Sequence, residues 1–239
     1  MAQFDISGSV DPLLSVTLTK GESLFAESNA MVAMDGTLSL SGRTKGGFFK
    51  SLARKFLNDE TFFQQKITAE DEGGRVLLAP NLPGDVVIID VAGDRQFLLS
   101  DGAFLASTEG VQISVASQGI GRALLGNSGG LFVMATEGEG RVAVSGFGSV
   151  RRIDIADGQK LIVDNGHLVA WEKSLDYELS INTARSGLLG KLVSSQTTGE
   201  GIVLKFKGPG AVYVCSRNKG GFLNWVFSQM PEEKAVKNE

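Results

Sequence analysis

Two stretches of the chain share one pattern: FLLSDGAFLA at residues 97–106 and LIVDNGHLVA at residues 161–170. Each consists of an apolar run, an Asp-Gly or Asn-Gly pair and a second apolar run. An Asx-Gly pair between two apolar runs is a strong signal for a β-hairpin turn. The two turn glycines, Gly102 and Gly166, are 64 positions apart. The pattern therefore predicts two copies of one β-unit.

Further matches extend the repeat along the chain. LLG at residues 124–126 recurs at residues 188–190, again 64 positions later, and SLFAESNAMVA at residues 23–33 has the shape of a third, weaker copy. The glycines at 84, 148 and 210 also line up, at spacings of 64 and 62. A period of this length is typical of repeat architectures. We predict a single domain over residues 1–230 with units of about 1–92, 93–156 and 157–220, a short C-terminal helix, and a frayed charged tail at 231–239.

The predicted fold class is all-β. Apolar and polar residues alternate over Val111–Val115 and Tyr177–Ile181, which indicates strands with one buried face. An open β-unit leaves exposed edges, and no Pro/Ser/Gly-rich spacer separates the units. We therefore expect one body in which the three units pack around a common axis with pseudo-threefold symmetry. The glycines expected to form structural turns are Gly84, Gly102, Gly148, Gly166 and Gly210.

Two short peripheral helices are predicted. In the first, at residues 47–57, aromatic and apolar residues four apart share one face beside Lys50, Arg54 and Lys55. The second, at residues 222–227, precedes Pro231. The apolar face of each helix either caps the β-body or contacts a membrane surface or partner. The candidate interaction surface consists of Phe48, Phe49, Phe56, Phe222 and Trp225.

Composition narrows the function classes. The chain has 239 residues, 42% hydrophobic and 21% charged, with a formal net charge of −4 that counts against a nucleic-acid partner. One cysteine and one histidine exclude an intrachain disulfide and a His/Cys zinc cage. A metal site built only from carboxylates stays open on these grounds, and we expect no cofactor. The sequence shows neither a signal-peptide pattern nor a run of eighteen apolar residues, so we expect a cytoplasmic protein.

Three residues are candidates for chemistry. GNSGG at residues 126–130 is similar to the segment around a chymotrypsin-type serine, but the one histidine, His167, follows Ser128 instead of preceding it. His167 also matches Ala103 in the other copy, which favours a packing role. Cys215 is either buried and inert or, if exposed beside Arg217, a thiol of lowered pKa. We expect no catalytic residues and no enzymatic activity.

Several motifs resemble one known family. They are GEGIVLKFKGPGAVYV at residues 199–214, GESLFA at residues 21–26, and the stretch from Asp157 to Trp171. They are similar to the mitochondrial biogenesis family named for altered inheritance of mitochondria, over roughly residues 5–220. The resemblance implies a β-fold grouped with the tryptophan-RNA-binding attenuation protein, of the double-stranded β-helix or β-sandwich class. The resemblance assigns no catalytic role to any residue of this chain.

The leading hypothesis is a non-enzymatic scaffold or interaction protein that associates with itself. A protein partner and peripheral membrane contact remain open as further roles. An alternative, by analogy with the attenuation-protein fold, is a module that binds a small ligand or RNA. A cupin-like metalloenzyme is the third reading, although such enzymes usually hold their metal with two or three histidines and this chain has one.

Overall fold

The computed structural model describes residues 2–43, 64–116, 133–181 and 202–230. β-strands dominate these ranges, and the helical elements in them are one α-helix, α4 (Lys219–Ser228), and one short 3-10 turn, η1 (Asn165–His167). The prediction of an all-β fold is confirmed.

The strands in the described ranges follow one another in three sets of six, after an N-terminal strand β1 (Gln3–Ser7). The first set is β2 (Leu13–Leu18), β3 (Ser23–Glu27), β4 (Met31–Met34), β5 (Leu38–Arg43), β6 (Gln64–Ala69) and β7 (Gly74–Leu78). The second set is β8 (Val86–Val91), β9 (Phe97–Ser100), β10 (Phe104–Thr108), β11 (Val111–Ala116), β12 (Val133–Gly138) and β13 (Gly140–Ser145). The third set is β14 (Val150–Ile155), β15 (Lys160–Asp164), β16 (Leu168–Glu172), β17 (Asp176–Ile181), β18 (Ile202–Lys207) and β19 (Gly210–Cys215).

The three sets pair their strands in the same antiparallel pattern. The sixth strand lies between the first and the third, as in β2-β7-β4, β8-β13-β10 and β14-β19-β16. The fifth lies between the second and the fourth, as in β3-β6-β5. The third strand of every set carries a register shift at the corresponding place, skipping Val32, Leu105 and Val169. Such a shift is a β-bulge, which bends the strand and re-aims its side chains.

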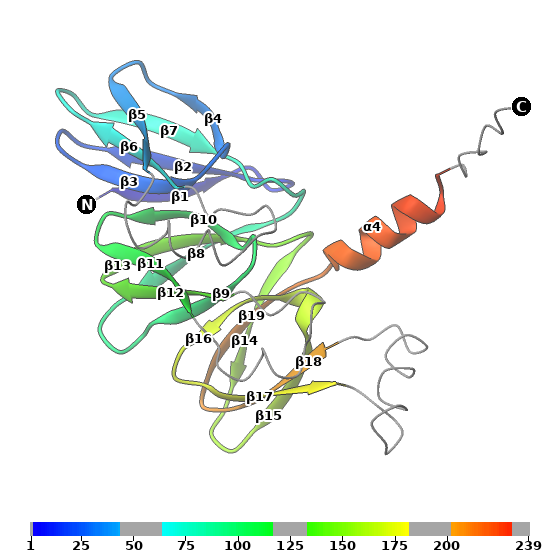
Figure 1. Ribbon diagram of the computed structural model, residues 1–239. Helices are drawn as coiled ribbons and strands as arrows, with labels where there is room; N and C mark the ends of the chain where they lie inside the picture. Colours follow the sequence, from blue (N-terminus) through cyan, green and yellow to red (C-terminus); the bar gives the residue numbers. More distant parts are fainter. Residues whose placement is uncertain (1, 44–63, 117–132, 182–201, 231–239) are drawn as a thin grey trace, which may run out of the picture.

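Consecutive sets are joined by shared sheets. β3 pairs with β10, and β9 pairs with β16, so each junction produces a six-stranded sheet that contains strands of two sets. In Figure 1 the sets form a row, from the blue N-terminal strands through green to the yellow and orange C-terminal strands. The predicted packing around a common axis is not confirmed, because no described strand of the first set pairs with one of the third.

The core fills the spaces between successive sheets in three clusters. Alternating residues of β2, such as Leu14, Val16 and Leu18, face the first cluster and are fully buried, while the residues between them are more exposed. Trp171 lies in the third cluster, where its ring meets Tyr177 and Phe206 edge-on at centroid distances of 5.6 and 6.0 Å. Burial of these apolar surfaces is the main force that holds the row together.

The turn glycines adopt two different conformations. Gly102 has a φ of +71°, and Asn29 occupies the corresponding turn of the first set with a φ of +66°. Asn tolerates this left-handed region better than most residues. Gly166, expected to behave like Gly102, lies instead within the 3-10 turn η1, outside the residues with positive φ. The expected turn is present at Gly166, but its backbone conformation differs from that of Gly102, because Asp164 accepts a hydrogen bond from the Gly166 N–H at 2.7 Å and tightens the turn.

The proposed correspondence of Gly84, Gly148 and Gly210 holds for two of the three. Gly84 and Gly148 precede the first strands β8 and β14, have positive φ, and bridge each other in parallel. A side chain on Gly84 would collide with the backbone of Gly146 and Gly148. Gly210, in contrast, begins the sixth strand β19, in the place where Gly140 begins β13. The match of Gly210 to the other two was wrong, because Gly210 begins a sixth strand whereas Gly84 and Gly148 each precede a first strand.

Candidate interaction surface

Helix α4 carries the largest concentration of exposed apolar side chains in the described ranges. It follows β19, projects away from the sheets (Figure 1), and has no buried residue. Trp225 is 61% exposed and Phe227 is 64% exposed. The other exposed apolar residues on and just after the helix are Phe222, Leu223 and Met230. Monomeric proteins rarely leave contiguous apolar patches uncovered unless the patch contacts a partner.

The apolar residues of α4 cover a wide face. Phe222 and Val226 lie four residues apart, as do Leu223 and Phe227, and these two rows are adjacent on a helix. The polar residues of the last turns, Asn224, Ser228 and Gln229, are uncharged. A helix that is apolar around more than half its circumference is normally buried against other protein.

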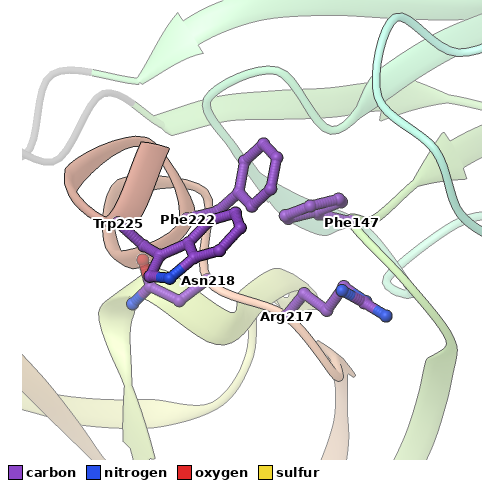
Figure 2. A pocket seen from close by; sticks show the side chains of 5 residues that line it. All are labelled: Phe147, Arg217, Asn218, Phe222 and Trp225. Atoms are coloured by element: carbon purple, nitrogen blue, oxygen red, sulfur yellow. The ribbon is translucent and has the colours of Figure 1, made fainter. Parts of the chain in front are cut away.

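A shallow hollow of about 360 Å³ lies at the root of α4, between the helix and the body. Figure 2 shows the ring of Phe222 above Phe147, with Trp225 beside it and Arg217 below. The Phe147 and Phe222 centroids are 5.3 Å apart in an edge-to-face arrangement, and the Arg217 guanidinium lies 5.7 Å from the Phe147 centroid. The hollow is lined by Phe147, Arg217, Asn218, Phe222 and Trp225.

Asn218 is the N-cap of α4. Its side-chain oxygen accepts a hydrogen bond from the Gly221 N–H at 3.0 Å, which satisfies one of the free donors in the first helical turn. The Asn218 side chain packs directly against Gly166, where a Cβ would overlap it. Gly166 is therefore needed for space at the helix root and not for a left-handed backbone.

The structure brings part of the predicted surface together. Phe222 and Trp225 both lie on α4, with ring centroids 6.2 Å apart. Phe48, Phe49 and Phe56 fall outside the described residues, as does Ser128. Sequence reasoning missed Phe147 as the body's contact with α4. Its only signal was an aromatic residue between two turn glycines, Gly146 and Gly148.

His167 and Cys215 have structural contacts. His167 Nδ1 lies 2.8 Å from the Cys215 carbonyl oxygen, which can only accept, so Nδ1 carries the proton. The Cys215 thiol donates to the Arg217 carbonyl at 3.2 Å. Burial raises the pKa of the Cys215 thiol, although hydrogen bonds with the backbone at Phe147 and Arg217 partly oppose the shift. The alternative of a thiol activated by Arg217 is therefore wrong, because the side chain points into the core.

No group of three or more His, Cys, Asp or Glu side chains in the described ranges is arranged to hold a metal ion. No helix there is long and apolar enough to cross a membrane.

The chain matches the family model described as Mitochondrial biogenesis AIM24 over residues 4–217. It belongs to the AIM24 family. It is similar to the Uncharacterized protein M6_Spy0233 of Streptococcus pyogenes serotype M6, with 33% identity over 236 residues that cover 96% of this chain and 91% of the relative. The crystal structure of protein SPYM3_0169 from Streptococcus pyogenes superposes on this AIM24 chain with a TM-score of 0.77 at 32% identity, covering 96% of this chain and all of the other.

Proposed function

We propose that this AIM24 protein is a non-enzymatic scaffold that associates with itself and binds a partner protein through α4. The observation that carries the proposal is the exposure of α4, in which Trp225 and Phe227 are more than 60% exposed on a helix with no buried residue. Helices bind the apolar grooves of partner proteins through apolar anchors three and four residues apart, the spacing of Phe222, Leu223, Val226 and Phe227.

The stability of α4 also supports a docking role. The helix has ten residues and two glycines in its first turn. Isolated helices shorter than about 12–15 residues are marginal in water, and each glycine costs roughly 1 kcal/mol relative to alanine. An apolar groove would bury the exposed side chains and stabilise the helix.

The polar residues of α4 favour a protein groove over a lipid surface. Helices that lie on membranes usually carry a strongly charged polar face rich in Lys and Arg. The polar residues in the last turns of α4 are uncharged, and its nearest basic residues, Arg217 and Lys219, lie at the N-terminal end. The partner that fits is a protein with a groove lined by apolar side chains.

Native mass spectrometry of the protein, purified gently from its own host, tests this proposal. The wild-type protein is expected to carry a second protein of defined mass. The Trp225→Ala/Phe227→Ala variant should lose that mass, whereas Leu40→Ala, at another exposed apolar side chain on β5, should retain it. Retention of the partner by the α4 variant would contradict the docking role. A reproducible metal-sized or metabolite-sized mass would favour a ligand-binding module instead.

A further inference from the structure

Each end sheet of the row has two edge strands in the part of the chain that the structure describes. One edge of β1-β2-β7-β4 is β4, and one edge of β15-β18-β17 is β15; these two are the outermost strands that correspond to strands paired inside the row. Inside the row their counterparts are joined. The counterparts of β15 are β3 and β9, and these pair with β10 and β16, the counterparts of β4. The two outermost strands are therefore the two halves of a junction that the chain forms twice elsewhere.

Apolar side chains on β4 and β15 are exposed where their counterparts at the inner junctions are buried. Val32 on β4 is 54% exposed, whereas its counterparts Leu105 and Val169, at the same bulge, are 0% and 2% exposed. Ile162 on β15 is 63% exposed, whereas its counterparts Phe25 and Leu98 are 7% and 5% exposed. Apolar side chains that the inner junctions bury are thus in water at the ends.

The inner junctions also define a register for the outer strands. Ala106 opposes Ala26 in the first junction, and Ala170 opposes Leu99 in the second. The corresponding register places Ala33 opposite Val163 and Met34 opposite Ile162. Both strands would run antiparallel, as in the two existing junctions.

Each end carries one half of an inner ion pair, whereas the positions that correspond to the other halves, Glu109 and Arg95, hold the uncharged residues Gly36 and Gln159. Lys66 of the first set pairs with Glu109 of the second at 3.0 Å, and Arg95 of the second pairs with Glu172 of the third at 3.4 Å. At the outer strands, Lys205 takes the place of Lys66, and Asp35 takes the place of Glu172. The β15 end thus offers a lysine and the β4 end a carboxylate.

We propose that β15 of one copy pairs with β4 of a second copy, so that molecules assemble head to tail through a third version of the inner junction. The proposal rests on the self-association in the proposed function and names its interface. Figure 1 places the two strands at opposite ends of the row, so the partner strand comes from another molecule. Because the contact joins two different surfaces, the assembly closes into a ring or continues as a filament.

Two single variants and their mixture test the head-to-tail interface. Ile162→Lys and Val32→Lys change exposed residues and place a charge where the inner junctions are buried. Each variant alone should be a monomer in analytical ultracentrifugation, whereas the wild-type protein forms larger species. In a mixture, the intact β15 of Val32→Lys and the intact β4 of Ile162→Lys can still pair. The mixture should therefore yield a 1:1 dimer and nothing larger.

Controls separate this interface from other contacts. Ile6→Lys changes an exposed apolar residue on β1, at the opposite edge of the β4 sheet, and should assemble as the wild type does. Unchanged melting temperatures show that the variants fold. A wild-type monomer, a mixture that remains monomeric, or variants that still assemble would overturn the proposal. The α4 variant Trp225→Ala/Phe227→Ala should assemble normally, so loss of partner binding and loss of assembly are distinguishable.

Discussion

The two tryptophans of the chain have opposite surroundings. Trp171, on β16, has no exposed surface and contacts the rings of Tyr177 and Phe206. Trp225, on α4, is 61% exposed, and its ring lies 6.2 Å from the ring of Phe222 on the same helix. The same side chain therefore stabilises the fold in the sheets and remains available for a partner on the helix. This contrast between body and helix separates the stability of the protein from its proposed recognition function.

Replacement of each tryptophan by alanine should give the largest difference between the two regions. Trp171→Ala removes a fully buried ring and leaves a cavity, so we expect the free energy of unfolding to fall by about 3–5 kcal/mol. Trp225→Ala should change it by less than about 0.5 kcal/mol, because the side chain is mostly in water. Urea denaturation followed by far-UV circular dichroism measures both. Equal losses would show that α4 is packed into the fold.

The two Asx-Gly turns should respond to valine in different ways. Gly102→Val forces a β-branched residue to a φ of +71° with open space around it, so backbone strain of about 1–3 kcal/mol is the expected cost. Gly166→Val should instead displace Asn218 from the root of α4. Calorimetry gives the stability change, and hydrogen exchange over Lys219–Ser228 reports on the helix. These assignments would be contradicted if amide exchange in α4 became faster in Gly102→Val, or if it stayed at the wild-type rate in Gly166→Val.

Loss of the N-cap should weaken the helix alone. Asn218→Ala removes the acceptor for the Gly221 N–H, which costs a helix about 0.5–2 kcal/mol. Amide exchange in α4 should accelerate, while exchange in β14 and β19 stays at wild-type rates. Asn218→Asp is the matched control because aspartate caps equally well. If the alanine variant exchanges no faster than this control, the cap does not hold α4.

The buried thiol should make the body slightly less stable at alkaline pH. Burial raises the pKa of Cys215 in the folded state, so the folded protein binds more protons than the unfolded chain once the pH passes the unfolded thiol's pKa of about 8.5. Stability therefore falls as pH rises from that value towards the folded pKa. Melting temperatures across this range should decline less in Cys215→Ala. Burial also raises the pKa of Tyr177, so the melting temperatures of both the wild type and Cys215→Ala should still fall at higher pH. An identical pH profile would mean that the thiol ionises as readily folded as unfolded.

Local patterns were enough to predict the fold class and the recurrence of a β-unit. Alternation over Val111–Val115 and the pair Asp101-Gly102 act within a few residues, so strands and turns can be inferred without knowing their neighbours. The helix around Phe222–Phe227 was predicted for the same reason, and α4 extends from Lys219 to Ser228. The conformation of Gly166 was not predictable, because the Asp164 side chain and the packing of Asn218 decide it.

The sequence by itself determined that the chain is all-β and belongs to the AIM24 family, because strand periodicity, turn residues and family motifs are all local. Only the tertiary structure decided which strands of different sets pair, that the sets lie in a row, and that Val32 and Ile162 are exposed while their counterparts are buried. The physical reason is that a side chain is buried only when a second surface covers it, and the local sequence does not say which surface that is. An apolar strand such as β15 has the same pattern whether or not another strand covers it.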